Sequence, residues 1–183
     1  DEIYLIKVIV SNYSDKGWAA DYDKIYAGYK EGMELYYKRN VIYSRDKLEK
    51  NRADIRELFK KIVDEYKKQV ETLLGEGASK VLMLYLDVSS RIDPNRFEAL
   101  YTNQQRLRVA YAQLDDAENA TYEKYFLGAI FHLRIAKSYG ISILEDLSTK
   151  PEEREAVKNK YRIDKADNLN RIFAEKPATE KTE

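Results

Sequence analysis

Proline and glycine are scarce in this chain, and their scarcity limits what it can fold into. The 183 residues include three prolines and seven glycines, so long stretches contain neither. These stretches consist mainly of Lys, Glu, Arg, Leu, Tyr and Ala. Most of these residue types favour the α-helix, and the glycines and prolines that usually mark turns are missing. The sequence therefore predicts an all-α protein.

The length of the chain is sufficient for a stable core without covalent support. A chain of this size buries roughly 70% of its unfolded surface on folding. Cysteine is absent, which excludes disulfides and thiolate metal sites and leaves both a cytoplasmic and a periplasmic location open. We expect residues 1–175 to form a single all-helical domain. Residues 176–183 form a polar segment that we expect to be a disordered tail.

The charge pattern excludes two classes of partner. Thirty-two basic residues balance thirty-two acidic ones, and the two signs are interspersed along the chain. Proteins that bind nucleic acid normally gather their basic residues on one surface, so we expect no such binding. The longest apolar stretches, such as residues 81–86, are far shorter than the ~20 residues that span a bilayer. We expect no membrane-spanning helix.

Apolar periodicity and turn residues predict the helices of the first half. The expected helices span residues 3–13, 20–40 and 44–74, with a loop at residues 14–17. Gly75 and Gly77 are expected to end the third helix, because glycine commonly terminates helices. Since no glycine or proline lies between Met33 and Leu74, a single rod is the alternative, but we favour a break near Asn40.

In the second half, a short apolar helix is expected at residues 78–90. Asp93 and Pro94 then form a helix start, with an N-cap followed by the first helical position. Asp115 and Asp116 indicate the next turn. A central helix is expected over residues 120–147. It carries two apolar stripes, so we expect neighbours on both of its sides. Thr149 and Glu152 match a capping box that opens a last helix reaching residue 174.

A row of aromatic residues occupies one face of the helix at residues 20–40. Tyr22, Tyr26, Tyr29, Met33, Tyr36 and Tyr43 follow one another at steps of four, three, four, three and seven residues. Tyrosine combines a large apolar ring with a hydroxyl that needs a polar partner, which suits a protein interface. Aromatic residues at helical spacing also occur in cores. Tyr36 and Tyr37 are adjacent, so both cannot face one seam, and we expect part of the row to be exposed. The predicted contact residues are Trp18, Tyr22, Tyr26, Tyr29, Tyr36, Tyr37 and Tyr43.

Catalytic and metal-binding signatures are weak in this sequence. It has one histidine, His132, and lacks HExxH, Glu-x-x-His and phosphate-binding glycine motifs. Asp21 with Asp23, and the acidic residues around Asp115, offer oxygen atoms for a hard cation. Acidic residues at helix starts more often favour the helix dipole, and we prefer that interpretation. We expect no enzyme activity, no cofactor and no metal.

Part of the chain resembles a tetratricopeptide helix pair. In the segment GMELYYKRNVIYSRDKLEKN, Gly32, Leu35, Ser44 and Leu48 match the small and large positions of that motif. Asn51 replaces the usual small residue, Arg56 replaces the usual proline, and no second copy follows at the 34-residue period. This resemblance implies a soluble adaptor that binds a peptide or a single protein partner.

The chain as a whole resembles the spirochaete flagellar coiling proteins of the periplasmic flagellar sheath. The resemblance rests on overall character, and mainly on the segments YDKIYAGYKEGMELYYKRN and YFLGAIFHLRIAKSYGISILEDL. It implies export to the periplasm, a structural role in motility, and contacts with other flagellar filament or sheath proteins.

These observations predict six or seven helices in antiparallel hairpins that form an elongated molecule. The predicted function is non-enzymatic assembly through the tyrosine-bearing helix. The tetratricopeptide-like adaptor is the alternative, and a deep pocket with converging polar groups beside the central helix would instead favour a ligand-binding protein or an enzyme.

Overall fold

The protein is an elongated bundle of α-helices, and the computed structural model describes residues 2–174, with the side chains at positions 90 and 91 left aside. Seven α-helices lie in this range: α1 (Glu2–Asn12), α2 (Ala19–Tyr37), α3 (Val41–Leu86), α4 (Pro94–Tyr122), α5 (Phe126–Asp146), α6 (Pro151–Lys160) and α7 (Arg162–Asn168). Two short 3₁₀ turns also lie in this range: η1 (Ser14–Lys16) between α1 and α2, and η2 (Val88–Arg91) between α3 and α4. The prediction of an all-α fold with six or seven helices is confirmed. The expected tail at residues 176–183 lies outside the described range.

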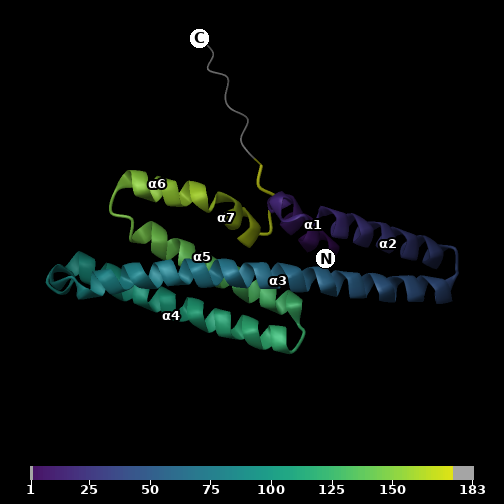
Figure 1. The fold of residues 1–183 in the computed structure, drawn as a ribbon, viewed down its shortest axis with the longest axis horizontal. Coiled ribbons are helices and arrows are strands. Elements are labelled where there is room, and N and C mark those ends of the chain that lie inside the picture. Colours follow the sequence, from purple (N-terminus) through teal and green to yellow (C-terminus); the bar gives the residue numbers. More distant parts are fainter. Residues whose placement is uncertain (1, 175–183) are drawn as a thin grey trace, which may run out of the picture.

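Helix α3 determines the shape of the molecule. Its 46 residues extend for about 70 Å at the usual rise per residue. Figure 1 shows α2 lying antiparallel along the first half of α3, and α4 returning antiparallel along the second half. Helix α5 packs against both α3 and α4, and α6 and α7 cover the C-terminal side of α5. The predicted antiparallel hairpins and elongated form are therefore present.

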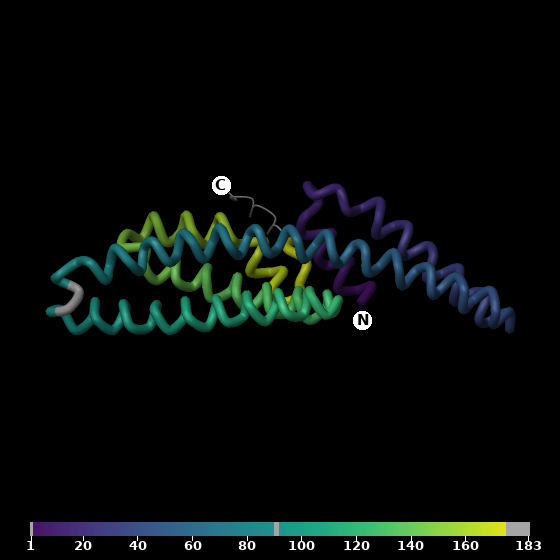
Figure 2. The backbone as a smooth tube through the Cα atoms, turned by 60° about the horizontal axis from the view of Figure 1, so that its bottom comes forward, coloured from purple at the N-terminus to yellow at the C-terminus, as the bar shows by residue number. Residues whose placement is uncertain are grey.

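The main core lies in the middle of the molecule, where α1, α3, α4 and α5 meet. Buried apolar side chains from all four helices form one cluster, including Ile9, Ile62, Leu114 and Leu133. Away from this centre, α3 has fewer neighbours. Its N-terminal end pairs with α2, and Figure 2 shows this pair projecting from the bundle as an arm. We call α2 together with residues 41–61 of α3 the arm.

The break between α2 and α3 was predicted correctly. Arg39 adopts a left-handed conformation with φ of 61°, and the backbone N–H groups of Lys38, Arg39 and Asn40 satisfy the last carbonyls of α2. The predicted helix end at Gly75–Gly77 is wrong, because α3 continues to Leu86. Both glycines remain helical. Gly77 is buried beside Ile143 of α5, so the packing of α5 along this stretch holds the helix together despite its glycines.

Two other predicted boundaries are shifted. Asp115 and Asp116 do not form a turn, since α4 continues to Tyr122. The reason is that Ala117 and Ala120, one turn further on, are buried against the bundle and extend the apolar face. The turn lies at residues 123–125, where Lys124 takes φ of 61°. The central helix α5 consequently begins at Phe126 instead of residue 120.

The predicted capping box does not form. Helix α6 begins with Pro151 at its first turn, and its N-cap is Lys150, without a capping side-chain hydrogen bond. The last helix also does not reach residue 174. It breaks at Tyr161, and α7 ends at Asn168, after which Asn170 takes a left-handed φ of 54°. The chain then turns back toward α1.

Candidate functional site

The two helices of the arm approach each other closely because their contact uses small and polar residues. The hydroxyl of Ser44 donates to the carbonyl oxygen of Gly32 at 2.8 Å in the buried seam. A Cβ atom on Gly32 would lie 2.6 Å from Cδ2 of Leu48, and one on Gly28 would lie 2.9 Å from Oδ1 of Asn51. Only glycine fits at these two positions without a shift of its neighbour. Gly32, Ser44 and Leu48 are the positions on which the tetratricopeptide resemblance rests.

Ion pairs run along the sides of this seam. Lys24 pairs with Asp54 at 2.8 Å, Lys61 pairs with Asp21 at 2.7 Å, and Lys47 pairs with Glu31. Each exposed pair contributes at most ~1 kcal/mol. The pairs nevertheless fix the register of α2 on α3 at three points along the arm. Asp21, considered above as a cation ligand, is occupied by Lys61.

Most of the predicted contact tyrosines lie on the surface of the arm. Tyr22 is half-buried and its ring stacks on that of Tyr26, with centroids 6.0 Å apart. The other five predicted contact tyrosines are exposed. Their exposed fractions are 46% for Tyr26, 39% for Tyr29, 56% for Tyr36, 76% for Tyr37 and 66% for Tyr43. Because glycine and serine close the seam, the rings of these five tyrosines remain available for contact with another protein.

The placement of Trp18 requires a correction to the predicted contact surface. Trp18 is buried in the main core, and its ring packs edge-on against Tyr13 with centroids 6.5 Å apart. It precedes α2 at the point where the arm joins the bundle, so burial there anchors the base of the arm. Trp18 is therefore a core residue and is not part of the exposed aromatic surface.

A buried polar cluster, which the sequence interpretation missed, ties α7 to the bundle. Asp167 is fully buried and receives two hydrogen bonds from Arg134 of α5, at 2.8 and 3.1 Å. The hydroxyl of Tyr66 on α3 donates to the same carboxylate at 2.5 Å. Asn12 of α1 accepts from the backbone N–H of Phe173 at 2.7 Å and donates to the carbonyl of Arg171 at 2.9 Å. Four segments of the chain thus meet around one carboxylate.

Lys137 lies in the same cluster, one helical turn after Arg134. Its ammonium donates to Asp164 at 3.0 Å, to Gln69 at 2.8 Å and to the hydroxyl of Tyr13 at 3.1 Å. It also lies 3.9 Å from the centre of the Tyr66 ring. Burial lowers the pKa of Lys137 below its usual value, and Asp164 opposes that effect. Burial raises the pKa of Tyr13 and of Tyr66 well above the usual value.

The spacing of these residues contained a signal for the cluster. Arg134 and Lys137 are three residues apart on an otherwise apolar helix, and Asp164 and Asp167 are three residues apart on α7. Two basic and two acidic residues with the same spacing match one another when the two helices lie side by side. Because the groups are buried and satisfied by one another, the cluster holds α1, α3, α5 and α7 together.

An open apolar groove follows the outer side of α5. It has a volume of about 1140 Å³ and is bordered by Leu5 of α1 and by the segment after α7. Phe131, Ile135 and Tyr139, the second apolar stripe of α5, line it, and Phe131 is largely exposed. The expectation that both sides of this helix are covered by neighbours is therefore wrong on this side. His132 also borders the groove, and its Nδ1 lies 3.0 Å from the amide oxygen of Gln113.

Comparisons with protein families, with curated proteins and with solved structures give no match to this chain. Among the described residues there is no group of three His, Cys, Asp or Glu side chains positioned to hold a metal ion. None of the helices described for residues 2–174 is long and apolar enough to cross a membrane.

Proposed function

We propose that this protein is a non-enzymatic assembly protein that contacts its partners through the exposed tyrosines of the arm. The observation that carries this proposal is the structure of the arm seam. Gly28, Gly32 and Ser44 close the two helices on each other, so the rings of Tyr26 and Tyr29 are not needed to hold the arm together. Exposed aromatic rings on a rigid support are favourable contact groups, since they have little conformational entropy to lose.

We place this activity in the sheath of a periplasmic flagellar filament, on the basis of the family resemblance given above. The elongated shape supports the proposal, because a long molecule with an extended charged surface offers lateral contacts along its whole length. The arm adds a projecting aromatic surface to this shape. The partners would be other filament or sheath proteins, and we assign no catalytic step to the chain.

One observation favours the alternative, a soluble adaptor. The helix pair around Gly32, Ser44 and Leu48 has the close contact that the tetratricopeptide resemblance implies. The groove along α5 is apolar and has room for a peptide segment. An adaptor of this kind would bind through Phe131 and Tyr139 of the groove, and not through the arm.

Affinity capture from the source cells tests the proposal. The wild-type protein is compared with Tyr26→Ser and Tyr37→Ser, after circular dichroism has shown that each variant is folded. Tyr111→Ser is the matched control, since Tyr111 lies on α4 and has an exposed fraction of 41%, close to that of Tyr26. Captured proteins are identified by mass spectrometry.

We expect the wild type and the Tyr111 variant to capture filament proteins. The two arm variants should capture at least tenfold less of these proteins. Capture of one soluble partner that depends on Phe131 and not on Tyr26 would support the adaptor instead. Unchanged capture by both arm variants would show that the tyrosines of the arm are not the contact surface.

A further inference from the structure

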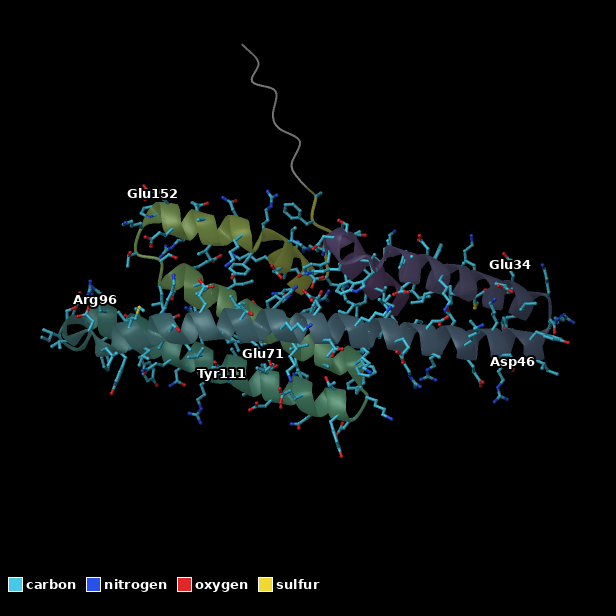
Figure 3. All side chains as sticks on the ribbon, viewed as in Figure 1. Glu34, Asp46, Glu71, Arg96, Tyr111 and Glu152 are labelled. Carbon is cyan, nitrogen blue, oxygen red and sulfur yellow. The ribbon has the colours of Figure 1, made fainter. Side chains whose placement is uncertain are left out.

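The two ends of the molecule carry the same kind of surface. Figures 1 and 2 show that the long axis ends at the α2–α3 turn on one side and at the α3–α4 connection on the other. Figure 3 labels Glu34 and Asp46 near the first end and Arg96 near the second. Both ends belong to α3, so a rigid helix of about 70 Å separates them.

Exposed apolar side chains gather at each end. The arm tip consists of Tyr36, Tyr37, Val41, Ile42 and Tyr43, with exposed fractions from 56 to 76%. The far tip consists of Leu82, Met83, Leu86, Val88, Ile92 and Phe97, with exposed fractions from 55 to 78%. The surface of α3 between the tips is rich in Lys, Glu, Asp and Arg instead. Apolar exposure on α3 is thus concentrated at its two ends.

The two tips match each other in size. With ~200 Å² for each large apolar side chain and about two-thirds of it exposed, each tip offers roughly 700 Å² of apolar surface. A stable protein interface buries about 800 Å² on each partner. Each tip therefore comes close to the area that a specific contact needs, and the other tip is a surface of equal extent on the same chain.

The charges at the tips favour unlike pairing. Residues 37–43 at the arm tip contain two cations, Lys38 and Arg39, and no acidic residue. Residues 82–97 at the far tip contain two carboxylates, Asp87 and Asp93, and two arginines. An arm tip against another arm tip would bring four cations together, whereas an arm tip against a far tip brings two cations to a surface whose own formal charges balance and that offers two carboxylates.

From these observations we infer that the partner of each tip is a second copy of this chain, with the arm tip of one molecule docked on the far tip of the next. This inference rests on the assembly function proposed above and names the partner of one part of the arm. The two tips lie at opposite ends of the long axis, so a contact between them leaves a free tip at each end of an open complex. Copies of the chain therefore join end to end into a strand.

The test blocks one tip at a time in the full chain. Ile42→Asp places a negative charge on the arm tip, and Ile92→Lys places a positive charge on the far tip, so each puts an unpaired charge into the apolar contact. Tyr122→Lys is the control, because Tyr122 ends α4 near the middle of the molecule and is 90% exposed. Tyr37→Asp and Met83→Lys provide a second pair if either first variant is unfolded by circular dichroism. Sedimentation velocity is measured over a hundredfold range of concentration.

The wild type and the Tyr122 variant should form species whose size increases with concentration. Each blocked variant alone should remain monomeric, with association at least tenfold weaker. An equimolar mixture of the two blocked variants should form dimers, because one intact tip of each kind is present. A monomeric wild type at all concentrations, or a mixture without dimers, would overturn the inference, and dimers of a single blocked variant would show pairing of like tips.

Failure of this test is separable from failure of the proposed function. The side of the arm that carries Tyr26 is intact in the Ile92→Lys variant. If that variant still captures filament proteins while the wild type does not self-associate, the assembly function stands and the end-to-end contact is refuted.

Discussion

Single residues in the buried cluster decide how the C-terminal part of the chain is held. Helix α7 has seven residues, and Asp167 is its buried member, so apolar packing contributes little to its position. Asp167 compensates for this by accepting hydrogen bonds from Arg134 and Tyr66. A buried charge that is satisfied in this way stabilises one specific arrangement of its helices, because any other arrangement leaves the charge without partners.

Replacement of Asp167 by Asn should therefore be strongly destabilising. The substitution leaves the guanidinium of Arg134 buried without a counter-charge, and we expect a loss of about 3–5 kcal/mol in the free energy of unfolding. Urea denaturation measures this loss. Asp46→Asn, on the exposed surface of the arm, is the control and should change stability by less than ~0.5 kcal/mol. A loss below ~1 kcal/mol for Asp167→Asn would contradict the role given to the cluster.

The buried tyrosines predict a specific loss of stability at alkaline pH. In the folded protein the pKa of Tyr13 and of Tyr66 is raised, so their stabilising contribution is complete below the usual tyrosine pKa of ~10 and is lost as the pH rises above it. The pKa of Lys137 is lowered in the folded protein, so the effect of Lys137 on the free energy of unfolding changes with pH in the opposite direction. Its contribution to stability grows as the pH rises and is complete above the usual lysine pKa of ~10.4.

Above the usual lysine pKa of ~10.4, where the contribution of Lys137 no longer changes, the free energy of unfolding should fall by about 1.4 kcal/mol per pH unit for each buried tyrosine. Tyr66→Phe should make the fall less steep by that amount. Val70→Ala, a core variant without a titratable group, should keep the wild-type slope. Urea denaturation at a series of alkaline pH values measures both slopes, and identical slopes in wild type and Tyr66→Phe would refute the burial of this hydroxyl.

At the scale of elements, helix type was predictable and helix length was not. The scarcity of glycine and proline predicted the all-α class, and Asp93–Pro94 predicted the start of α4, where Asp93 accepts a hydrogen bond from the backbone N–H of Asn95. Local signals failed where tertiary packing outweighs them. The sequence cannot show that α5 lies beside Gly77, and without that neighbour a pair of glycines indicates a helix end.

Two glycine substitutions test the continuity of α3 and its contact with α5. Gly75 is helical and its Cβ position is open, so Gly75→Ala should stabilise the protein by about 1 kcal/mol. Gly140 faces α3, and a Cβ atom there would lie 2.7 Å from Cγ of Leu73. Gly140→Ala should therefore destabilise by about 1–3 kcal/mol. Thermal denaturation measures both, and a destabilising Gly75→Ala would indicate that α3 is interrupted there.

The candidate site was predictable to a similar degree. The helical spacing placed four tyrosines on the outside of the arm, and adjacency to Tyr36 added Tyr37. The spacing did not show that Trp18 differs from them, because Trp18 is buried by the core at the base of the arm. The buried cluster was missed for a related reason. Its partners come from separate helices, as with Tyr66 and Asp167, which are 101 residues apart along the chain, and only the fold brings them together.

At the scale of the whole molecule, a packed centre lies between the arm and the far tip, and both of these leave apolar groups exposed. The centre holds the core and the polar cluster, and the arm extends from it with its tyrosines outward. Exposed aromatic rings also occur at the centre, as at Tyr122 and Phe131, but the arm carries five exposed tyrosines on one projecting helix pair. Exposed apolar groups gathered in this way often mark a contact surface, and that is the role we propose for them. The central claim is that these tyrosines touch a partner.

Site-specific photo-crosslinking in the source cells tests that claim most directly. A photoreactive phenylalanine derivative replaces Tyr29 in one variant and Tyr111 in another, two positions with nearly equal exposed fractions of 39 and 41%. If the tyrosines of the arm contact a partner, we expect a crosslinked protein adduct from position 29 and none from position 111. Adducts from position 111 together with none from position 29 would contradict it.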